Sequence, residues 1–586
     1  MFFYLDYRFS TDSATVGVNL FDTGTPSFAQ TNCLYLQAGC QRLEKLDTPG
    51  GKLLLLGDPV FRNRPSLGKE ISPAPGEILE TLLYETIRGH YYWFLIHPEG
   101  ICCGASFGGI FPVYYHIGQD RAVLCSASFF LADRIDAPAG NSRNLLERLL
   151  FNYPFFPNTW WASIRLLDAH RYLRITRAAG YIDGQFEIRR FFGHGEGDSR
   201  RHLLHLVELF EAESGLFFPE TRFGISFTGG FDGRTLLAAA RKAGRRDFLT
   251  YSFGRPGASD VTFPEAQTKK LGIPYFPVLL DQTYLEQYAA ESAAAFMRLT
   301  EYNGNFGRPH YHYAARLLAR QVDYLITGNF GSEMFRALHQ PGVMMTEQLI
   351  RVFAAPDQSW KDALRLAATG WNGACFREEL DELIADLEQY LAPMSGWEPN
   401  HKFYHFVFNE IFRKYFGPEL IMQSHYLNNR TPFLSLRFFR ALNDTIWSGV
   451  HSRLFEKQKN KRLKGQIFYS SFLRHTDPQL YRQPTSKGYS PADVLERWRW
   501  PLLAGKVLMK KYLEKPECDS NAETAFWDRC RAPIQQRILE KDDGFLHAAG
   551  MIPRLREAEA RNDLETAIRL CSIAEGWTSA KTSVMT

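Results

Sequence analysis

The segment 226–235, SFTGGFDGRT, places a glycine turn between an apolar run at 223–227 and a run that favours a helix. This order predicts a buried strand, a tight turn and a helix. Unpaired backbone N–H groups and the dipole at the start of such a helix suit a phosphate group. Gly229 and Gly230 let the backbone approach the phosphate without a Cβ atom in the way. Asp232 would repel a bare phosphate, so its carboxylate indicates a metal ion that bridges phosphate oxygens.

Further strands and helices are predicted to alternate after this turn. Asp260 is suited to cap a helix that reaches about Leu271, just before Gly272. Alternating strands and helices predict a doubly wound parallel sheet, in which ligands bind beyond the carboxyl ends of the strands. The glycine turn, the segment around Phe253 and the segment around Gly328 all follow strands, so we expect them to line one site. The additional apolar runs lie at 248–253, 275–280 and 323–327.

These segments, in this order, resemble the synthetase domain of the asparagine synthetase family. The family's pyrophosphate loop is Ser-Gly-Gly-x-Asp-Ser, and here Thr228 and Gly233 stand at the two serine positions. A later loop, Ser-Gly-Glu-Gly-x-Asp-Glu-x-Phe in the family, resembles 327–335, which reads TGNFGSEMF. The family's Arg-x-Pro-Phe-Leu-Asp resembles 430–435, RTPFLS, the most specific single match. The resemblance implies an α/β ATP-pyrophosphatase domain of the adenine nucleotide α-hydrolase-like class.

The first 195 residues resemble the glutaminase domain of the same family, because short aromatic strands are predicted at 89–96, 108–115 and 122–128. Active members use a cysteine directly after the initiator methionine as nucleophile. Here that position holds Phe2, and the first cysteine is Cys33. A phenyl side chain cannot form a thioester, so we expect no glutaminase activity. Family members with such a degenerate first domain include β-lactam synthetases and lasso peptide macrolactam cyclases.

The expected fold is therefore an α+β Ntn-hydrolase-like sandwich at 1–195, the ATP-pyrophosphatase domain at 200–515 and a helical C-terminal extension at 516–586. A polar, glycine-rich stretch at 193–198 is typical of a linker between the first two. A chain of 586 residues is long enough for several cores.

Composition argues against several classes of protein. Lys and Arg number 68 against 64 Asp and Glu, a net charge of +4, which argues against a nucleic-acid-binding surface. The nine cysteines show neither zinc spacing nor a disulfide framework, as expected for reduced thiols in the cytoplasm. No apolar run approaches the roughly 18 residues of a membrane-spanning helix, so no membrane partner is expected. No signal peptide is expected either.

The resemblance implies that a substrate carboxylate attacks the α-phosphate of ATP, which gives an acyl-adenylate and pyrophosphate, and that an amine then displaces AMP. ATP and Mg²⁺ are the expected cofactors. For Arg234 two interpretations stay open, a bidentate contact to phosphate and a plain helix-surface arginine. The residues expected to bind the nucleotide are Ser226, Thr228, Gly229, Gly230, Asp232, Gly233, Arg234, Ser252, Phe253, Gly254 and Gly328.

Three departures from the family pattern bear on the chemistry. Ser332 stands where the family has its second metal-binding aspartate, so we expect Asp232 and the adjacent Glu333 to hold the metal and to be catalytic. Asn329 replaces a glutamate that the family links to amine attack, and an amide cannot act as a base. Lys487 lies one position away from the family's usual spacing and is the residue expected to stabilise the transition-state charge.

Three functions stay open on the sequence alone. The first is an ATP-dependent ligase that forms an amide, lactam or macrolactam in natural-product biosynthesis, with an internal amine. The second is an ammonia-dependent amidation of a small acid or sugar acid, and the third is a catalytically degenerate binding or scaffold protein. The expected partner is a carboxylate substrate, either a small molecule or a precursor peptide. A peptide substrate would bring a partner protease or peptide-recognition protein, and homodimers are common in such families.

Overall fold

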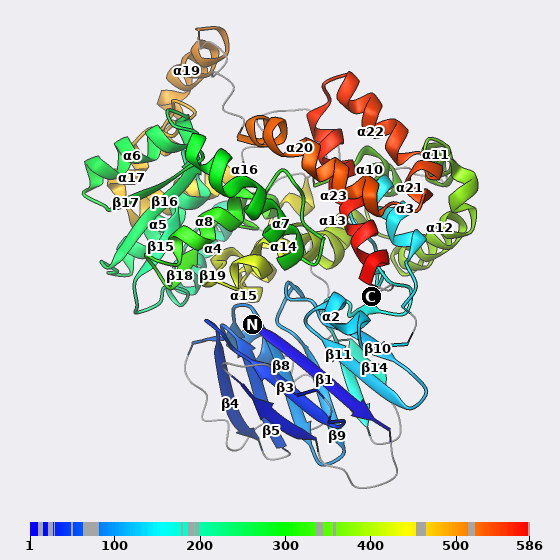
Figure 1. Cartoon of the computed structure of the whole chain (residues 1–586). Coiled ribbons are helices and arrows are strands. Elements are labelled where there is room, and N and C mark those ends of the chain that lie inside the picture. The colour runs from blue at the N-terminus through cyan, green and yellow to red at the C-terminus, as the bar shows by residue number, and fades with distance from the viewer. Residues whose placement is uncertain are drawn as a thin grey trace.

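The computed structural model describes residues 1–9, 16–21, 27–28, 30–48, 51–62, 81–136, 138–176, 180–185, 193, 198–335, 344–354, 359–452, 464–513 and 522–583. Figure 1 shows two stacked sheets in the first part of the chain, a parallel sheet covered by helices in the middle part, and helices in the last part. This arrangement confirms the expected sequence of a β-sandwich, an α/β region and a helical C-terminal region. The boundaries proposed between these regions stay predictions, and of the expected linker only Gly193 and Asp198 lie within the described residues.

The sandwich consists of two six-stranded sheets whose facing aromatic side chains form its core. The ring of Phe3 meets those of Tyr92 and Phe94 edge-on at 4.7 and 5.1 Å. Only β2 and β3 pair in parallel within these sheets as described. The first sheet has the order β12 (Arg165–Leu166), β10 (Tyr114–Ile117), β11 (Arg121–Cys125), β1 (Phe2–Arg8), β3 (Cys33–Gln37), β2 (Gly17–Leu20). The second has the order β14 (Gly180–Gln185), β13 (Arg171–Thr176), β9 (Gly100–Ala105), β8 (Tyr91–His97), β5 (Gly51–Gly57), β4 (Arg42–Thr48).

The middle part contains a five-stranded sheet in which all described pairs are parallel. Four of its strands confirm the predicted runs, and Pro277 is tolerated because its strand lies at the sheet edge, where one row of backbone groups is unpaired. The fifth strand, which carries Arg430, was not predicted. The order is β17 (Tyr275–Leu279), β16 (Phe248–Gly254), β15 (Phe223–Ser226), β18 (Tyr324–Ile326), β19 (Asn428–Arg430).

Helices flank this sheet as the alternating pattern predicts. The prediction that Asp260 caps its helix is wrong, since the helix begins at Ser259 and the carboxylate lies in the first turn. The predicted end is confirmed, because Gly272 closes the helix with a left-handed φ of 65°. These helices are α4 (Ser199–Gly215), α5 (Asp232–Lys242), α6 (Ser259–Leu271), α7 (Ala289–Leu299), α8 (His310–Leu318) and α9 (Gly331–Phe335).

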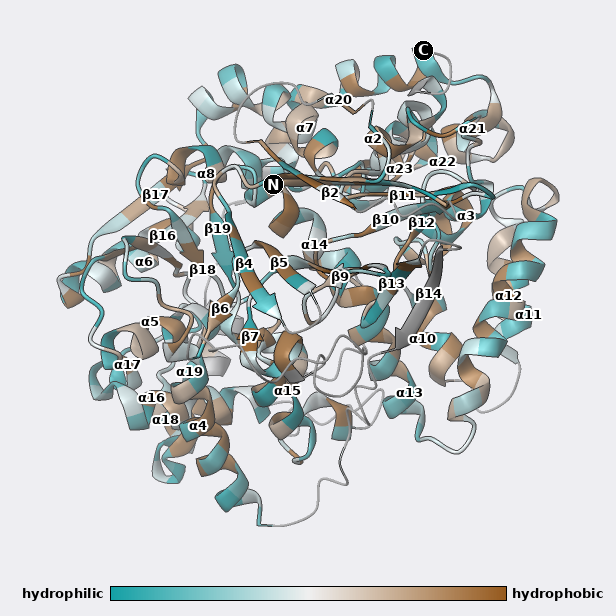
Figure 2. Ribbon diagram, turned by 90° about the horizontal axis from the view of Figure 1, so that it is seen from below, coloured by the Kyte–Doolittle hydropathy of each residue, from teal (hydrophilic) through white to brown (hydrophobic). Residues whose placement is uncertain are grey.

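The rest of the chain is mainly helical and packs against both earlier parts. Hydrophobic residues gather on interior strands such as β5 and β18, whereas outer helices such as α11 and α12 carry hydrophilic ones (Figure 2). The principal helices of this part are α10 (Glu347–Ala354), α11 (Ser359–Thr369), α12 (Arg377–Leu391), α13 (Pro399–Phe406), α14 (Phe412–Gln423), α15 (Leu436–Asn443), α16 (Lys464–Thr476), α17 (Pro478–Arg482), α18 (Pro491–Leu495), α19 (Trp500–Leu513), α20 (Ala522–Lys541), α21 (Phe545–Ala548), α22 (Met551–Ala560) and α23 (Leu564–Ser583). Two more helices, α2 (Ser128–Ala132) and α3 (Ser142–Phe151), lie between strands β11 and β12 of the sandwich.

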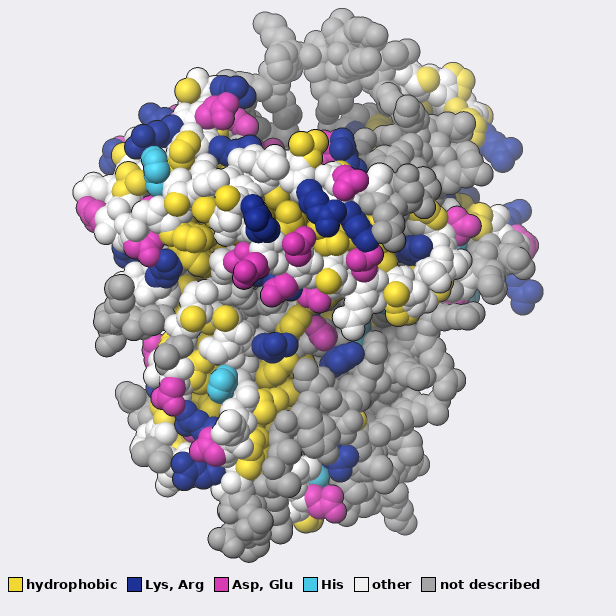
Figure 3. Space-filling model, turned by 90° about the vertical axis from the view of Figure 1, so that its right-hand side faces the viewer, with side chains coloured by type: hydrophobic (Ala, Val, Ile, Leu, Met, Phe, Trp, Pro, Cys, Tyr) yellow, Lys and Arg dark blue, Asp and Glu magenta, His cyan; other side chains and the backbone are white. Residues whose placement is uncertain are grey.

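Charges of both signs are interspersed on the face shown in Figure 3. Ion pairs such as Lys361 with Glu388, and Arg365 with Asp381, join helices α11 and α12. This face therefore does not gather one sign of charge. Among the described residues, no helix is both long and apolar enough to cross a membrane.

A buried ion pair joins the sandwich to the parallel sheet. Arg430 at the end of β19 donates from Nε and Nη2 to both carboxylate oxygens of Asp58, at 2.6 and 2.9 Å. Both side chains are almost completely buried. The neighbouring Thr431 lies 2.9 Å from Nε2 of His90, so the 430–435 motif anchors the sandwich against the sheet.

Replacing Asp58 with asparagine should lower the free energy of unfolding by about 3–5 kcal/mol, because it leaves the Arg430 guanidinium buried without its counter-charge. Urea unfolding followed by circular dichroism measures this loss. Asp120→Asn is the matched control, because the exposed Asp120 pairs with Arg8 at 3.7 Å and such pairs contribute at most about 1 kcal/mol. Equal losses in the two variants would contradict the anchoring role.

Candidate functional site

The glycine turn lies where the strand order of the parallel sheet reverses. Strand β15 is followed outward by β16 and β17 on one side, while β18 and β19 lie on its other side. Loops that leave such a reversal point diverge, which opens a crevice at the carboxyl ends of the strands. The glycine turn follows β15 and the Gly328 loop follows β18, so the structure brings both predicted segments to this crevice.

The two loops touch through Asp232, the first residue of α5. A Cβ atom added to Gly328 would come within 2.6 Å of the Asp232 Cβ, and one added to Gly331 within 3.0 Å of its Oδ1. Only glycines fit so close to this carboxylate. Gly233 serves a different purpose, since its missing side chain lets α5 lie against the Ser226 carbonyl of β15.

The Lys487 loop covers the other side of the glycine turn. A Cβ atom added to Gly229 would lie only 2.0 Å from the Cβ of Ser486, whose backbone N–H donates to the Gly229 carbonyl at 3.1 Å. Lys487 is exposed and its own N–H donates to Thr485 Oγ1 at 3.3 Å. The structure therefore brings the Lys487 loop and the glycine turn together through Ser486, although the sequence separates them widely.

Arg234 fits neither interpretation of the sequence. It is completely buried, so it is not a helix-surface arginine. Its Nη1 donates to the carbonyls of Leu480 and Gln483 at 3.2 and 3.4 Å, and its Nη2 to that of Pro484 at 2.8 Å. These bonds occupy the end of the guanidinium that a phosphate would need. Burial lowers the pKa of Arg234 to about 10, which still leaves it charged. The described contacts make it a support for the Lys487 loop.

Asp232 and Glu333 occupy comparable positions, in the first turns of α5 and α9. Oε1 of Glu333 accepts a hydrogen bond from Ser332 Oγ at 3.0 Å. Within the described ranges no group of three or more metal-ligating side chains occurs. Mg²⁺ commonly takes one or two carboxylates and fills its other positions with water and substrate phosphates, so Asp232 and Glu333 stay candidate ligands.

The segment predicted to contact adenine forms the end of β16. Ser252 is buried and its hydroxyl bonds to the Asp260 carbonyl and, at 2.7 Å, to the Tyr275 hydroxyl. Phe253 is half-buried, and its ring packs against His310 at 4.8 Å and against Tyr311. The Gly254 carbonyl accepts a bond from the backbone of the next strand. Ser252 therefore fixes the segment, while the Phe253 ring packs against the first residues of α8.

Backbone strain occurs in the Gly328 loop at Phe330, which has a φ of 72°. A bulky side chain rarely adopts this left-handed conformation. The ring is fully buried, with the Phe416 ring 4.3 Å and the Phe412 ring 5.4 Å away, and this packing holds the strained residue in place. Such strain is often found at ligand-binding loops.

Glu419 of α14 is a candidate functional residue that sequence reasoning missed. Its carboxylate is buried, accepts a bond from Gln423 Nε2 at 3.3 Å and lies near the side chain of Asn329 in the Gly328 loop. The amide nitrogen of Asn329 makes no hydrogen bond within the described part of the chain. Burial raises the pKa of Glu419 to about 7, against the opposing influence of Arg308. No local motif marks Glu419, since its importance comes from a contact with a distant loop.

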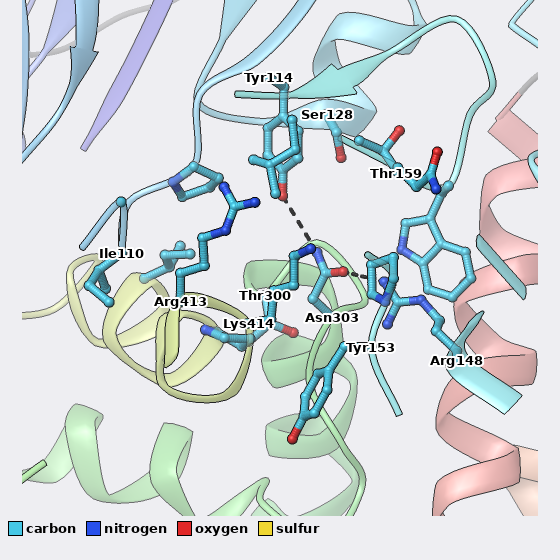
Figure 4. Close-up of a pocket in the computed structure, with 18 residues that line it drawn as sticks. Ile110, Tyr114, Ser128, Arg148, Tyr153, Thr159, Thr300, Asn303, Arg413 and Lys414 are labelled. Carbon is cyan, nitrogen blue, oxygen red and sulfur yellow. Dashed lines mark hydrogen bonds between the residues drawn. The ribbon is translucent and has the colours of Figure 1, made fainter. Parts of the chain in front are cut away.

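Two adjoining cavities of about 50 and 190 Å³ lie next to α14. Figure 4 shows the smaller one, with Arg413 and Lys414 of α14 on one side and Arg148 on another. Tyr114 points down from the sandwich toward Asn303, which it meets at 3.5 Å. Glu419 lines the larger cavity. Both are lined by Arg148, Tyr153, Asn303, Lys414 and Pro418.

Comparisons with known proteins show only a distant similarity. No protein-family model and no curated protein matches the chain. Among solved structures it is similar to glutamine phosphoribosylpyrophosphate (PRPP) amidotransferase from B. subtilis, complexed with ADP and GMP, at 11% sequence identity and a TM-score of 0.14. The match covers 40% of this chain and 47% of that one, so the chain spans less than half of that amidotransferase. Function is therefore inferred from the site itself.

Proposed function

We propose that the chain is an ATP-dependent ligase that adenylates a substrate carboxylate, releases pyrophosphate and couples the acyl group to an amine. The observation that carries this proposal is the convergence of the glycine turn, Asp232, Gly328 and the Lys487 loop at the reversal point of the parallel sheet. Backbone N–H groups at the start of α5 suit the pyrophosphate of ATP. The resemblance to the asparagine synthetase family supports the same chemistry.

Each residue of the site would have a separate role in the reaction. Asp232 and Glu333 would hold Mg²⁺, which supplies charge neutralisation at the phosphates when bound. Lys487 would stabilise the negative charge that builds up as the bond to pyrophosphate breaks. Arg234 would hold the Lys487 loop in place through its three carbonyl bonds. The carboxylate oxygen forms a bond to the α-phosphorus, and pyrophosphate leaves with the electron pair of the broken bond.

Glu419 is our candidate for the base that takes a proton from the attacking amine. Asn329 cannot accept this proton, but it interacts with Glu419, which thus lies beside the predicted nucleotide loop. An amine nitrogen that attacks the acyl carbon must lose a proton, and the carboxylate can receive it. AMP then leaves from the tetrahedral carbon.

The pH dependence of amide formation tests this role. Because the pKa of Glu419 is about 7, its carboxyl group is protonated below that pH and cannot act as a base. The rate should therefore fall about tenfold per pH unit below 7 and level off above it. Glu419→Gln should remove this dependence together with most activity, whereas Glu208→Gln on the exposed side of α4 should retain it. A rate that is independent of pH from 5 to 8 in the unaltered protein would contradict the assignment.

The amine is not expected to come from glutamine. The Phe2 ring packs edge-on against the rings of Phe28 and Phe130, at 6.3 and 4.9 Å, and offers no nucleophile. Incubation of the protein with glutamine should therefore release no glutamate, as measured with glutamate dehydrogenase. Turnover-dependent release of glutamate would contradict the prediction. A requirement for added ammonium would favour amidation of an acid over use of an internal amine.

The test of the proposed function is a pair of measurements with the full chain. MgATP should bind, and Asp232→Asn should weaken its binding because the metal loses a carboxylate. Pyrophosphate release should then require both MgATP and a carboxylic acid. Binding of MgATP without pyrophosphate release from any acid tested would favour the scaffold hypothesis.

A further inference from the structure

The larger cavity is enclosed by elements from distant parts of the chain. Its walls come from α14, from the segment that precedes α8, from α3 and from the C-terminal helices α20 and α23. Helix α23 also lies against α3. The cavity is unusually rich in charge, with Arg148, Arg308, Lys414 and Arg569 on the one hand and Glu419, Glu523 and Glu565 on the other.

Arg148 is the most buried of the cationic groups, at 4% exposure. Its Nε donates to the side-chain oxygen of Asn144 at 2.8 Å, its Nη2 donates to that of Asn303, and the guanidinium lies 4.0 Å from the centre of the Trp160 ring. Among the described residues, no carboxylate lies within 4 Å of it. Burial lowers the pKa of Arg148 to about 9, so it stays charged at neutral pH. A cation is thus buried without an ion-pair partner in the described part of the chain.

Two further arginines repeat this pattern. Nη2 of Arg308 donates to the Tyr415 hydroxyl, and Nη1 of Arg569 donates to the Leu149 carbonyl and to Asn152 at 3.1 and 3.2 Å. Neither has a carboxylate within 4 Å in the ranges that the structure describes. Both guanidinium groups therefore donate hydrogen bonds to neutral oxygens and can still bind an anion.

Glu419 supplies the opposite charge at one end of the same cavity. It is 6% exposed and has no cationic group within 4 Å among the described residues. Glu523 and Glu565 are exposed and lie at the rim. Among the described residues these charges thus face one space without a direct ion pair across it, although Arg308 and Glu419 attract each other at longer range. Lys414 already pairs with Glu410 outside the lining. Burying the other charges is costly, and a ligand that contacts both signs would offset part of that cost.

We propose that this cavity binds one small dipolar molecule that carries both a carboxylate and an amine. Arginines suit the carboxylate, because their guanidinium groups present paired donors to its two oxygens. Glu419 suits the amine. The volume of about 190 Å³ slightly exceeds that of the cavity of about 150 Å³ that binds benzene in another protein. A molecule of amino-acid size fits, whereas a folded peptide does not.

The identification of this ligand as the source of the attacking amine rests on the proposed function, whereas its binding does not. Glu419 connects the cavity to Asn329 of the nucleotide loop, so a bound amine would lie next to the predicted reaction centre. Helices α20 and α23 line the cavity, which makes the C-terminal region part of substrate recognition. The amine substrate is then a small amino acid-like compound and not a precursor peptide.

Isothermal titration without ATP tests the binding site directly. The probes are the standard L-α-amino acids and L-ornithine, each compared with its N-acetyl and its C-amide derivative. At least one unmodified probe should bind with a Kd below about 1 mM, and both derivatives should bind at least about tenfold more weakly because each loses a charge. Arg308→Gln and Arg148→Gln should weaken that binding by about 10–100-fold.

Arg365→Gln is the matched control, since Arg365 lies on α11 and pairs with Asp362 and Asp381 outside the cavity. It should bind the probe as the unaltered protein does, and all three variants should retain the affinity for MgATP, which reports on folding. Failure of every probe to bind, or equal affinity in the arginine variants, would overturn the proposal. Probe binding without incorporation of the probe into an amide product would leave the binding site standing and contradict only the ligase function.

Discussion

Replacing Lys487 with alanine should reduce the rate of pyrophosphate release by about 10²–10³-fold, while MgATP still binds. The reason is that Lys487 lies in the loop that covers the glycine turn and would neutralise charge that appears only in the transition state. A group of this kind lowers kcat and leaves the ground-state complex largely intact. Rapid-quench measurement of pyrophosphate, together with titration of MgATP, separates the two effects.

Two further variants serve as comparisons for Lys487→Ala. Lys487→Arg keeps the positive charge and should recover part of the rate, although its geometry differs. Lys269→Ala removes an exposed lysine from the last turn of α6 and should change neither quantity. Full activity in Lys487→Ala would exclude the charge-stabilising role, and loss of MgATP binding would reassign the residue to ground-state binding.

The second large effect is expected from Gly229→Ala. The added Cβ would lie 2.0 Å from the Cβ of Ser486, so the Lys487 loop and the glycine turn must move apart. A displacement of about 1 Å at a reaction centre can cost about 10²-fold in rate. We therefore expect a fall in kcat of that order and a loss of about 1–3 kcal/mol in the free energy of unfolding, since the contact is overpacked.

Gly396→Ala is the control for this experiment, because its Cβ would meet no atom within 4 Å. It should leave both activity and thermal stability close to those of the unaltered protein. Gly230→Ala adds a comparison within the turn, since its nearest atom would be Thr228 Oγ1 at 3.6 Å. Gly230→Ala should keep the stability that Gly229→Ala loses. Equal stability of Gly229→Ala and Gly230→Ala would show that the Ser486 contact is not tight in solution.

Local sequence patterns predicted most of the parallel sheet, because four of its strands are apolar runs next to helix signals. Strand β19 was missed because Asn428, Asn429 and Arg430 are polar. They are nevertheless buried, since they have partners elsewhere in the chain: Asn429 accepts a bond from Thr327 and Arg430 donates to Asp58 of the sandwich. A buried polar strand of this kind depends on tertiary partners that no local pattern contains.

The candidate functional site was also predictable from the sequence only in part. The glycine turn and the loop at Gly328 follow strands, and topology alone brings them to the crevice. The part played by Arg234 was not predictable, because its hydrogen-bond partners are carbonyls near residue 484 at the end of a distant helix. Glu419 was missed for the same reason, since it reaches Asn329 only in the folded chain.

The central claim is that a carboxylate of the substrate attacks the α-phosphate of ATP at this crevice. It is tested most directly by an acid whose carboxyl group carries ¹⁸O, incubated with MgATP and the full chain. Mass spectrometry should find one ¹⁸O atom in the AMP that is released, with an equal amount of pyrophosphate. Release of ADP and phosphate, or AMP without the label, would contradict the account.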